Sequence, residues 1–103
     1  MRDVLQSCTG CDFEKANLEG IDLSGIRASN DDFSGANLRG VNFDGSFLTG
    51  FDFSNADLAG ARMNGTTLSS CDLSGANMTG VDVSRTTFIG TDFSERRNGS
   101  SPP

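Results

Sequence analysis

Residues 31–50 read DDFSG ANLRG VNFDG SFLTG, which is four five-residue units that each end in glycine. The third place of each unit is large and apolar: Phe33, Leu38, Phe43 and Leu48. An α-helix would spread these residues over all of its sides, so the units are not helical. The first three places alternate like a short strand, and glycine adopts the backbone angles of a tight corner. The stretch therefore predicts a chain that turns a corner every five residues.

The same unit repeats from about residue 11 to residue 95 without an insertion. A period of 20 residues aligns residues of the same type, whereas a period of 15 would align Ala16 with Asp31 and Ser46. We therefore expect four units per coil and about four coils, stacked through backbone hydrogen bonds into an all-β solenoid. The outward places aligned by this period include one uniform column: Asp12, Asp32, Asp52, Asp72 and Asp92.

The length of 103 residues is that of a single domain. We expect an N-terminal cap over residues 1–10, the coil over residues 11–95, and a disordered polar tail over residues 96–103. A coil end exposes unpaired backbone and core, and little follows Phe93 that could cover it. We therefore expect the C-terminal end of the coil to be covered by self-association, which gives a homodimer.

The units at 16–20 (ANLEG), 36–40 (ANLRG), 56–60 (ADLAG) and 76–80 (ANMTG) resemble the repeat of the pentapeptide-repeat family. The resemblance implies a right-handed quadrilateral parallel β-helix. The best-understood members of that family are acidic rods that imitate duplex DNA, bind type II topoisomerases and confer quinolone resistance. This chain differs from them because its coil is shorter, it carries no projecting loop, and its C-terminal sequence does not resemble their helical dimerisation module.

The composition argues against several classes of function. The net charge is −6, so phosphate would repel this chain and we expect no direct binding of nucleic acid. No run of 18 apolar residues exists, and the first residues contain no apolar stretch of secretory-signal length. We therefore expect a cytoplasmic protein without a membrane partner. There is no histidine, and a filled rod offers no pocket, so we expect no enzyme activity, cofactor or metal site.

The aspartate column and Phe47 are the candidate partner-binding residues. The column could imitate DNA phosphates in front of a basic cleft, or its aspartates could simply bond nearby backbone at the corners. Phe47 stands at an outward place where the other coils carry Arg27, Thr67 and Thr87. It is either a contact for a partner or a cover over Arg27, held by a cation–π interaction one coil away.

Two inward places carry unusual residues. Phe51 occupies a place that is usually small, so it is either part of the core or pushed outward to form an apolar patch with Phe47. Asp31 is charged at an inward place, and a charge is not buried without a partner. We expect a local bulge that turns Asp31 to water.

The three cysteines give little evidence of a site. Cys8 and Cys11 form a CxxC motif, but no second pair is present to complete a zinc site, and a disulfide between them would need an oxidising compartment. Cys11 and Cys71 are read as small inward residues. The aspartate column is too flat for the convergent oxygens that calcium requires. Two hypotheses remain: a non-enzymatic protein-interaction or structural module, and a DNA-mimic inhibitor or protector of DNA gyrase or another type II topoisomerase.

Overall fold

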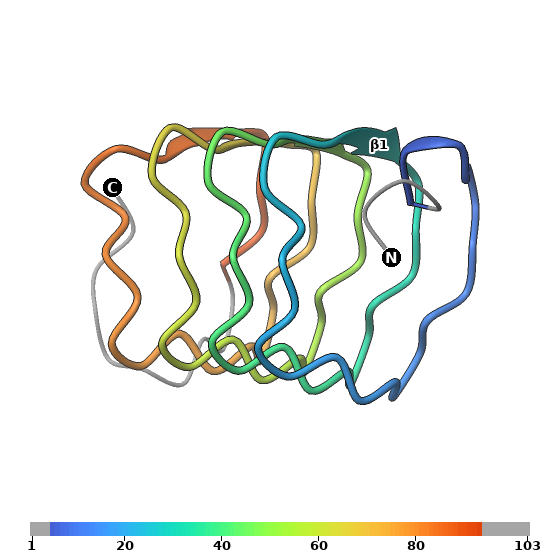
Figure 1. Ribbon diagram of the computed structural model, residues 1–103, viewed down its shortest axis with the longest axis horizontal. Helices are drawn as coiled ribbons and strands as arrows, with labels where there is room; N and C mark the ends of the chain where they lie inside the picture. The colour runs from blue at the N-terminus through green and yellow to red at the C-terminus, as the bar shows by residue number, and fades with distance from the viewer. Residues whose placement is uncertain (1–4, 94–103) are drawn as a thin grey trace.

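The computed structural model describes residues 5–93, which wind into a four-sided coil (Figure 1). One side is a parallel sheet in the order β1-β2-β3-β4, with one strand contributed by each coil. Its strands are β1 (Arg27–Ser29), β2 (Phe47–Thr49), β3 (Thr67–Ser69) and β4 (Thr87–Ile89). Strands β1, β2 and β3 each pair with the strand 20 residues later, as Arg27 does with Phe47. The expected 20-residue period is therefore confirmed.

The other three sides are joined by parallel bridges at the same spacing, including Asp12 to Asp32 and Asn17 to Asn37. Backbone hydrogen bonds connect the coils, such as Phe33 N to Asp52 O at 2.8 Å. The predicted right-handed quadrilateral β-helix of about four coils is confirmed. We call residues 11–15, 31–35, 51–55, 71–75 and 91–93 the acidic wall, and residues 26–30, 46–50, 66–70 and 86–90 the strand wall.

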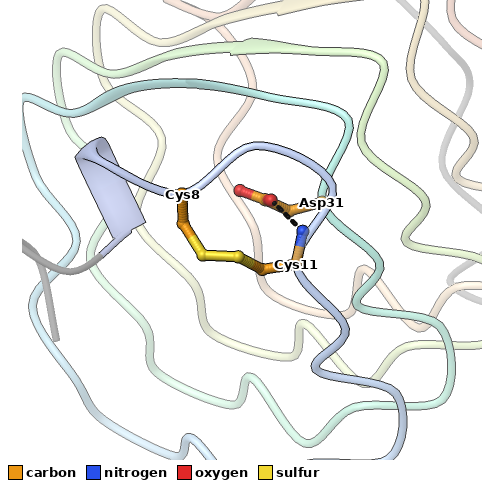
Figure 2. A group of neighbouring side chains, drawn as sticks. All are labelled: Cys8, Cys11 and Asp31. Atoms are coloured by element: carbon orange, nitrogen blue, oxygen red, sulfur yellow. Dashed lines mark hydrogen bonds between the residues drawn. A yellow bond between two sulfur atoms is a disulfide. The ribbon is translucent and has the colours of Figure 1, made fainter.

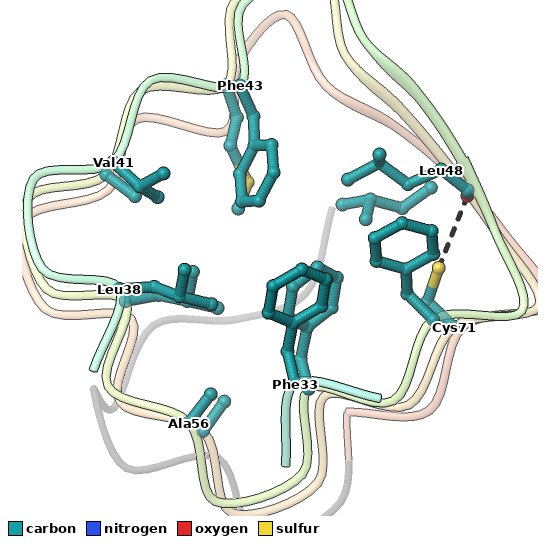
Figure 3. Close-up of a cluster of buried hydrophobic side chains, with 14 of the residues drawn as sticks. Phe33, Leu38, Val41, Phe43, Leu48, Ala56 and Cys71 are labelled. Carbon is teal, nitrogen blue, oxygen red and sulfur yellow. Dashed lines mark hydrogen bonds between the residues drawn. The ribbon is translucent and has the colours of Figure 1, made fainter. Parts of the chain in front are cut away.

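Large apolar side chains fill the axis of the coil (Figure 3). The ring of Phe33 stacks on Phe13 at 5.0 Å and on Phe53 at 5.7 Å between centroids. Phe51 is only 1% exposed and lies 5.4 Å from Phe33, so it belongs to the core and forms no patch with Phe47. Each buried ring removes a large apolar area from water, which makes this stack a main source of stability.

Small hydroxyl residues also point inward, and each donates a hydrogen bond to a carbonyl of the previous coil. Ser46 and Thr66 are fully buried, and Thr66 Oγ1 lies 2.6 Å from Phe43 O. Ser46 Oγ lies 2.7 Å from Leu23 O, again 23 residues earlier. A hydroxyl can be buried at this inward place because it donates its hydrogen to a carbonyl oxygen. The sequence pattern did not predict this role.

The last residue of nearly every unit has a positive φ, which glycine adopts without strain. Four other residues also adopt it: Lys15, Asn30, Asn55 and Ser70. Arg85 does not, and in the described chain no bridge joins its side of the coil, residues 81–83, to the coil before. There Gly65 N bonds Arg85 O, whereas the preceding corner pairs Gly45 N with Asn64 O.

The N-terminal cap is partly described. Leu5 is fully buried against the first coil. Residues 1–4 of the predicted cap lie outside the described residues, and so does the predicted tail over residues 96–103. The last coil carries partly buried apolar residues that pack on the core: Val81, Val83, Phe88 and Phe93. Between residues 5 and 93, no helix has the length and apolar character needed to cross a membrane.

Candidate functional site

The aspartate column lies on the outer side of the acidic wall, with one aspartate per coil. Parallel bridges join Asp12 to Asp32, Asp32 to Asp52, Asp52 to Asp72 and Asp72 to Asp92. Neighbouring coils are about 4.8 Å apart, so these carboxylates form a regular negative stripe. Asp12 and Asp92 are exposed, and the three between them are partly exposed. The structure thus brings all five predicted residues together.

Four of these carboxylates, those of Asp12, Asp32, Asp52 and Asp72, also have a local role in their corners. Asp32 Oδ1 accepts a hydrogen bond from Ser34 N at 2.9 Å and from Ser34 Oγ at 2.7 Å. Asp52 and Asp72 bond Ser54 and Ser74 in the same way. The pKa of Asp32 is lowered because the Ser34 hydroxyl and amide stabilise its charged form more than burial disfavours it. These aspartates of the column therefore bond nearby backbone at their corners, as one of the two hypotheses predicted.

The corner does not require a charge. Asn42 occupies the matching place on another side and accepts from Asp44 N at 2.9 Å, and Asn37 accepts from Arg39 N at 3.2 Å. Neutral asparagine thus performs the same hydrogen bonding as aspartate. The negative charges of the column exceed what the fold needs.

Charges on the other sides of the rod are offset by cations. Arg39 contacts Asp57 at 3.0 Å and Arg62 contacts Asp44 at 2.7 Å, each across neighbouring coils. The acidic wall has Lys15 as the single cation in its sequence ranges, against six outward carboxylates. The strand wall has no acidic residue in its ranges. The rod therefore presents one strongly negative side and one side without carboxylates.

Phe47 is 44% exposed on the strand wall. The Arg27 guanidinium lies 4.7 Å from its ring centroid, so the predicted cation–π pair one coil away is present. An open depression beside the ring is lined by Arg27, Ala28, Ser29, Phe47 and Thr49. Ile89, which is 54% exposed on the same wall, was not among the predicted contact residues. Its outward place in a unit was the signal that could have found it.

Asp31 differs from the sequence-based expectation. The predicted bulge is wrong, because Asp31 is 1% exposed and Asp32 keeps its regular bridges on both sides. Asp31 Oδ1 accepts a hydrogen bond from Cys11 N at 2.8 Å, while Oδ2 is buried with no hydrogen-bond partner among the described residues. Burial raises the pKa of Asp31 more than the amides of Cys11 and Gly10 lower it.

Asp31 lies directly against the CxxC motif (Figure 2). Cys8 and Cys11 form a disulfide with a Cα–Cα distance of 5.9 Å, and both residues are partly exposed. The two sulfurs and a carboxylate oxygen of Asp31 all lie within 4.8 Å of one another. Cys71, by contrast, is buried and its Sγ donates to Leu48 O at 3.3 Å, as a small inward residue. Burial raises the pKa of Cys71 to about 11, so this thiol stays protonated.

Comparison with protein families identifies the repeat. The family model for pentapeptide repeats matches eight copies, over residues 7–44, 32–69 and 68–95. This chain belongs to the pentapeptide-repeat family. A search of curated protein sequences found no significant match.

Several solved pentapeptide-repeat structures resemble this one. A pentapeptide-repeat protein from Nostoc PCC 7120 is 30% identical, with a TM-score of 0.62 over 88% of this chain and 90% of that one. One from the Arabidopsis thaliana thylakoid lumen is 33% identical, with a TM-score of 0.60 over 88% and 65%. Trypsin-treated QnrB1, a plasmid-mediated fluoroquinolone resistance protein, is 25% identical, with a TM-score of 0.59 over 88% and 54%. The chain spans about half the length of that resistance protein.

The pentapeptide repeat explains why sequence reasoning found the column but not the cysteine–aspartate cluster. The period placed Asp31 one coil above Cys11, which was a usable signal. It was overlooked because an unpaired inward charge was expected to leave the core. The amide of Cys11 instead holds the carboxylate inside.

Proposed function

We propose that this chain is a non-enzymatic protein-interaction module whose acidic wall binds a basic surface on a protein partner. The observation that carries the proposal is the surplus of charge in the aspartate column. Asparagine satisfies the same corner hydrogen bond elsewhere in the rod, so the fold alone gives no reason for a stripe of carboxylates. Aligned like charges cost stability, and binding a cationic partner would offset that cost.

The unequal sides of the rod support a directional contact. Arg39 and Arg62 pair with carboxylates on two other sides, whereas the acidic wall has only Lys15 in its ranges. On the strand wall Phe47 offers an exposed aromatic ring, a residue type that often anchors a protein interface. The acidic wall would therefore steer the partner, and Phe47 would supply an apolar contact at the adjacent wall.

The shape and chemistry of the rod favour binding over catalysis. The axis is filled by buried side chains, and the depression beside Phe47 is open to solvent. The sequence contains no histidine. Catalysis generally uses convergent groups in a concave site, and the flat walls do not supply one. We expect no cofactor for the interaction.

The test uses asparagine substitutions that remove charge but keep the corner hydrogen bond. A triple variant with Asp32→Asn, Asp52→Asn and Asp72→Asn is compared with a control that removes three charges elsewhere: Glu19→Gln, Asp22→Asn and Asp82→Asn. Partners captured from a lysate of the source organism are identified with the wild-type protein, and their binding is then measured with purified components. We expect the triple variant to lose binding and the control to keep it. Equal binding by the triple variant and wild type would refute the proposal for the acidic wall.

Phe47→Ala tests the apolar contact separately. If the partner is held by charge alone, this variant binds like wild type. If Phe47 anchors the interface, its truncation weakens binding by about 1 kcal/mol or more. The result assigns the contact to one wall or to both.

A second candidate function is that of a DNA mimic acting on gyrase or another type II topoisomerase. It is favoured by the acidic column together with the 25% identity to the fluoroquinolone resistance protein QnrB1. A gyrase supercoiling assay with the purified protein, with and without a fluoroquinolone, tests this candidate. Inhibition or protection that is lost in the triple asparagine variant would support it. No effect at high micromolar protein would exclude it and leave the general proposal intact.

We also propose that the C-terminal end of the coil self-associates. Phe88 and Phe93 pack together there, with ring centroids 4.8 Å apart, and both are only partly buried. Sedimentation velocity at millimolar protein should detect a dimer, and Phe88→Ser should shift the protein toward monomer. A strict monomer at that concentration would refute this proposal. A cytoplasmic location remains a prediction from the sequence.

A further inference from the structure

The cysteine–aspartate cluster is a second site that the interaction proposal does not use. Its three residues come from two coils: Cys8 and Cys11 at the start of the first, and Asp31 from the coil above (Figure 2). Cys11 and Asp31 occupy inward places of the acidic wall, behind the aspartate column, so the cluster is distinct from the outward carboxylates.

The unpaired oxygen of Asp31 points to a missing ligand. Oδ1 is held by the amide of Cys11 at 2.8 Å, while the buried Oδ2 has no hydrogen-bond partner in the part of the chain that the structure describes. A buried polar atom without a partner costs free energy, and a buried carboxylate costs more than a neutral group. The fold keeps this carboxylate in a place where alanine is the common residue of other units. A cation beside Oδ2 would remove the cost.

The two cysteines have the chemistry and spacing to hold such a cation. Two residues separate them, which is a common spacing of paired cysteine ligands of zinc. Their sulfurs and a carboxylate oxygen of Asp31 already lie within 4.8 Å of one another. Two thiolates and one carboxylate favour a borderline-soft divalent ion such as Zn²⁺ over Ca²⁺ or Mg²⁺, which prefer oxygen ligands. Three protein ligands leave the fourth tetrahedral position to water.

We propose that Cys8, Cys11 and Asp31 form a site for a zinc-class divalent cation when the Cys8–Cys11 disulfide is reduced. A dithiol reductant transfers two electrons and two protons to the disulfide, giving two cysteine thiols and a cyclic disulfide of the reductant. The cation then displaces one proton from each thiol and is bound by two thiolates and Asp31. A disulfide oxidant reverses the step: it accepts two electrons from the two cysteine thiolates and is itself reduced to two thiolates, the Cys8–Cys11 bond re-forms, and the cation is released. The site is therefore closed by the same bond that the structure contains. In a reducing compartment the pair would be open for binding.

Binding would fasten the N-terminal segment to the coil. Cys8 lies in the turn after Leu5, which covers the first coil, and Asp31 belongs to the second coil. A shared cation therefore connects the cap and two coils at one point. The reduced protein should become more stable when the cation is added, because binding to the folded state alone shifts the unfolding equilibrium.

The test uses Co²⁺ as a spectroscopic probe and the full chain. Protein is reduced with a dithiol, freed of reductant under argon and titrated with Co²⁺, while the thiolate-to-cobalt charge-transfer band is recorded. We expect one Co²⁺ per chain and displacement by Zn²⁺. The oxidised protein should give no band. Absence of the band in the reduced protein, or an equal band in the oxidised protein, would overturn the proposal.

Three variants assign the ligands. Cys8→Ser should abolish the charge-transfer band, and Asp31→Asn should weaken Co²⁺ binding at least about tenfold. Cys71→Ser is the matched control, because Cys71 is buried three coils from Cys11 and should leave binding unchanged. Circular dichroism of each variant shows that the coil is intact. Unchanged affinity in Asp31→Asn would remove Asp31 from the site, and loss of binding in Cys71→Ser would refute the assignment.

Discussion

Asp31 and Asp32 are neighbours in sequence but lie on opposite sides of the acidic wall. Asp31 points to the core, where burial raises its pKa. Asp32 points outward, and the hydroxyl and amide of Ser34 lower its pKa. The same carboxyl group thus has opposite proton affinities because strand-like alternation reverses its environment at each residue. Inward places of a wall therefore favour apolar side chains and hydrogen-bonded donors, whereas outward places accommodate charged side chains.

Among the substitutions that test this contrast between inward and outward residues, one at Phe53 should change the free energy of unfolding most. Its ring is fully buried and contacts Phe33, Phe43 and Phe51. Phe53→Ala should lower the free energy of unfolding by about 3–5 kcal/mol, because it leaves a cavity in the stack. Urea unfolding measures this value. The control Phe47→Ala, on the outer side of the rod, should cost less than about 1 kcal/mol.

The next effect concerns the inward carboxylate in the oxidised protein. Asp31→Asn removes a buried charge and keeps the acceptor for Cys11 N, so it should raise the free energy of unfolding by about 1–2 kcal/mol at neutral pH. The raised pKa means that folded protein binds the proton more tightly than unfolded chain. Wild-type stability therefore falls as pH rises from the ordinary aspartate pKa through the raised value. The gain from Asp31→Asn should shrink at about pH 3.

Asp32→Asn serves as the opposite control in the same titration. Because the folded-state pKa of Asp32 is lowered, its charge contributes stability above the ordinary aspartate pKa, and that contribution is lost as pH falls. The loss caused by Asp32→Asn should therefore be present above the ordinary aspartate pKa and should disappear as pH falls through the lowered folded-state pKa. If both variants changed stability with pH in the same direction, the contrast between the two sides would be wrong.

A smaller effect is expected at the inward hydroxyls. Thr66→Val leaves Phe43 O without the donor at 2.6 Å and should cost about 1 kcal/mol. Thr67 is the matched outward neighbour, and Thr67→Val should change stability by less than about 0.5 kcal/mol. Thermal unfolding of the two variants compares them directly. Equal costs would show that the hydroxyl of Thr66 contributes nothing beyond its volume.

The smallest effect is expected at the outward charge. Asp52→Asn removes repulsion from Asp32 and Asp72 but weakens the charge-assisted bonds from Ser54, so the free energy of unfolding should change by less than about 0.5 kcal/mol. Unfolding at low and high salt measures this change, which should be smaller at high salt. A substantial loss at both salt concentrations would show that the charge itself maintains the corner.

Most of the fold was predictable because a fixed repeat length determines which residues of neighbouring coils lie side by side. Once 20 residues are taken as one coil, every residue has known neighbours above and below, and the outward positions of Asp52 and Phe47 follow directly. The core position of Phe51 was left open because its size suits either side. The structure shows that its ring fits beside Phe33.

The predictions from the sequence failed where the repeat shows whether a side chain points inward or outward but not which groups surround it. The inward place of Asp31 was visible, but the sequence did not show that Cys11 N would hold its carboxylate inside. Arg85 visibly replaces the glycine expected at its corner. The altered hydrogen bond of Gly65 N nevertheless depends on the backbone of Arg85, which lacks the positive φ that the other non-glycine corners adopt. Such details depend on local backbone geometry rather than on the repeat.

In two of the four corner columns, those through Asn30 and Asn55, residues with side chains alternate with glycine along the rod. The oxygen of Asn30 lies against the position that a β-carbon of Gly50 would occupy, and Asn55 is placed likewise over Gly75. The column through Asn30 then continues with Ser70 and Gly90, so its true repeat is two coils. Removing residues 31–50 would set Ser70 directly on Asn30, whereas removing 40 residues would preserve the alternation. This rod should therefore gain or lose length most easily in pairs of coils.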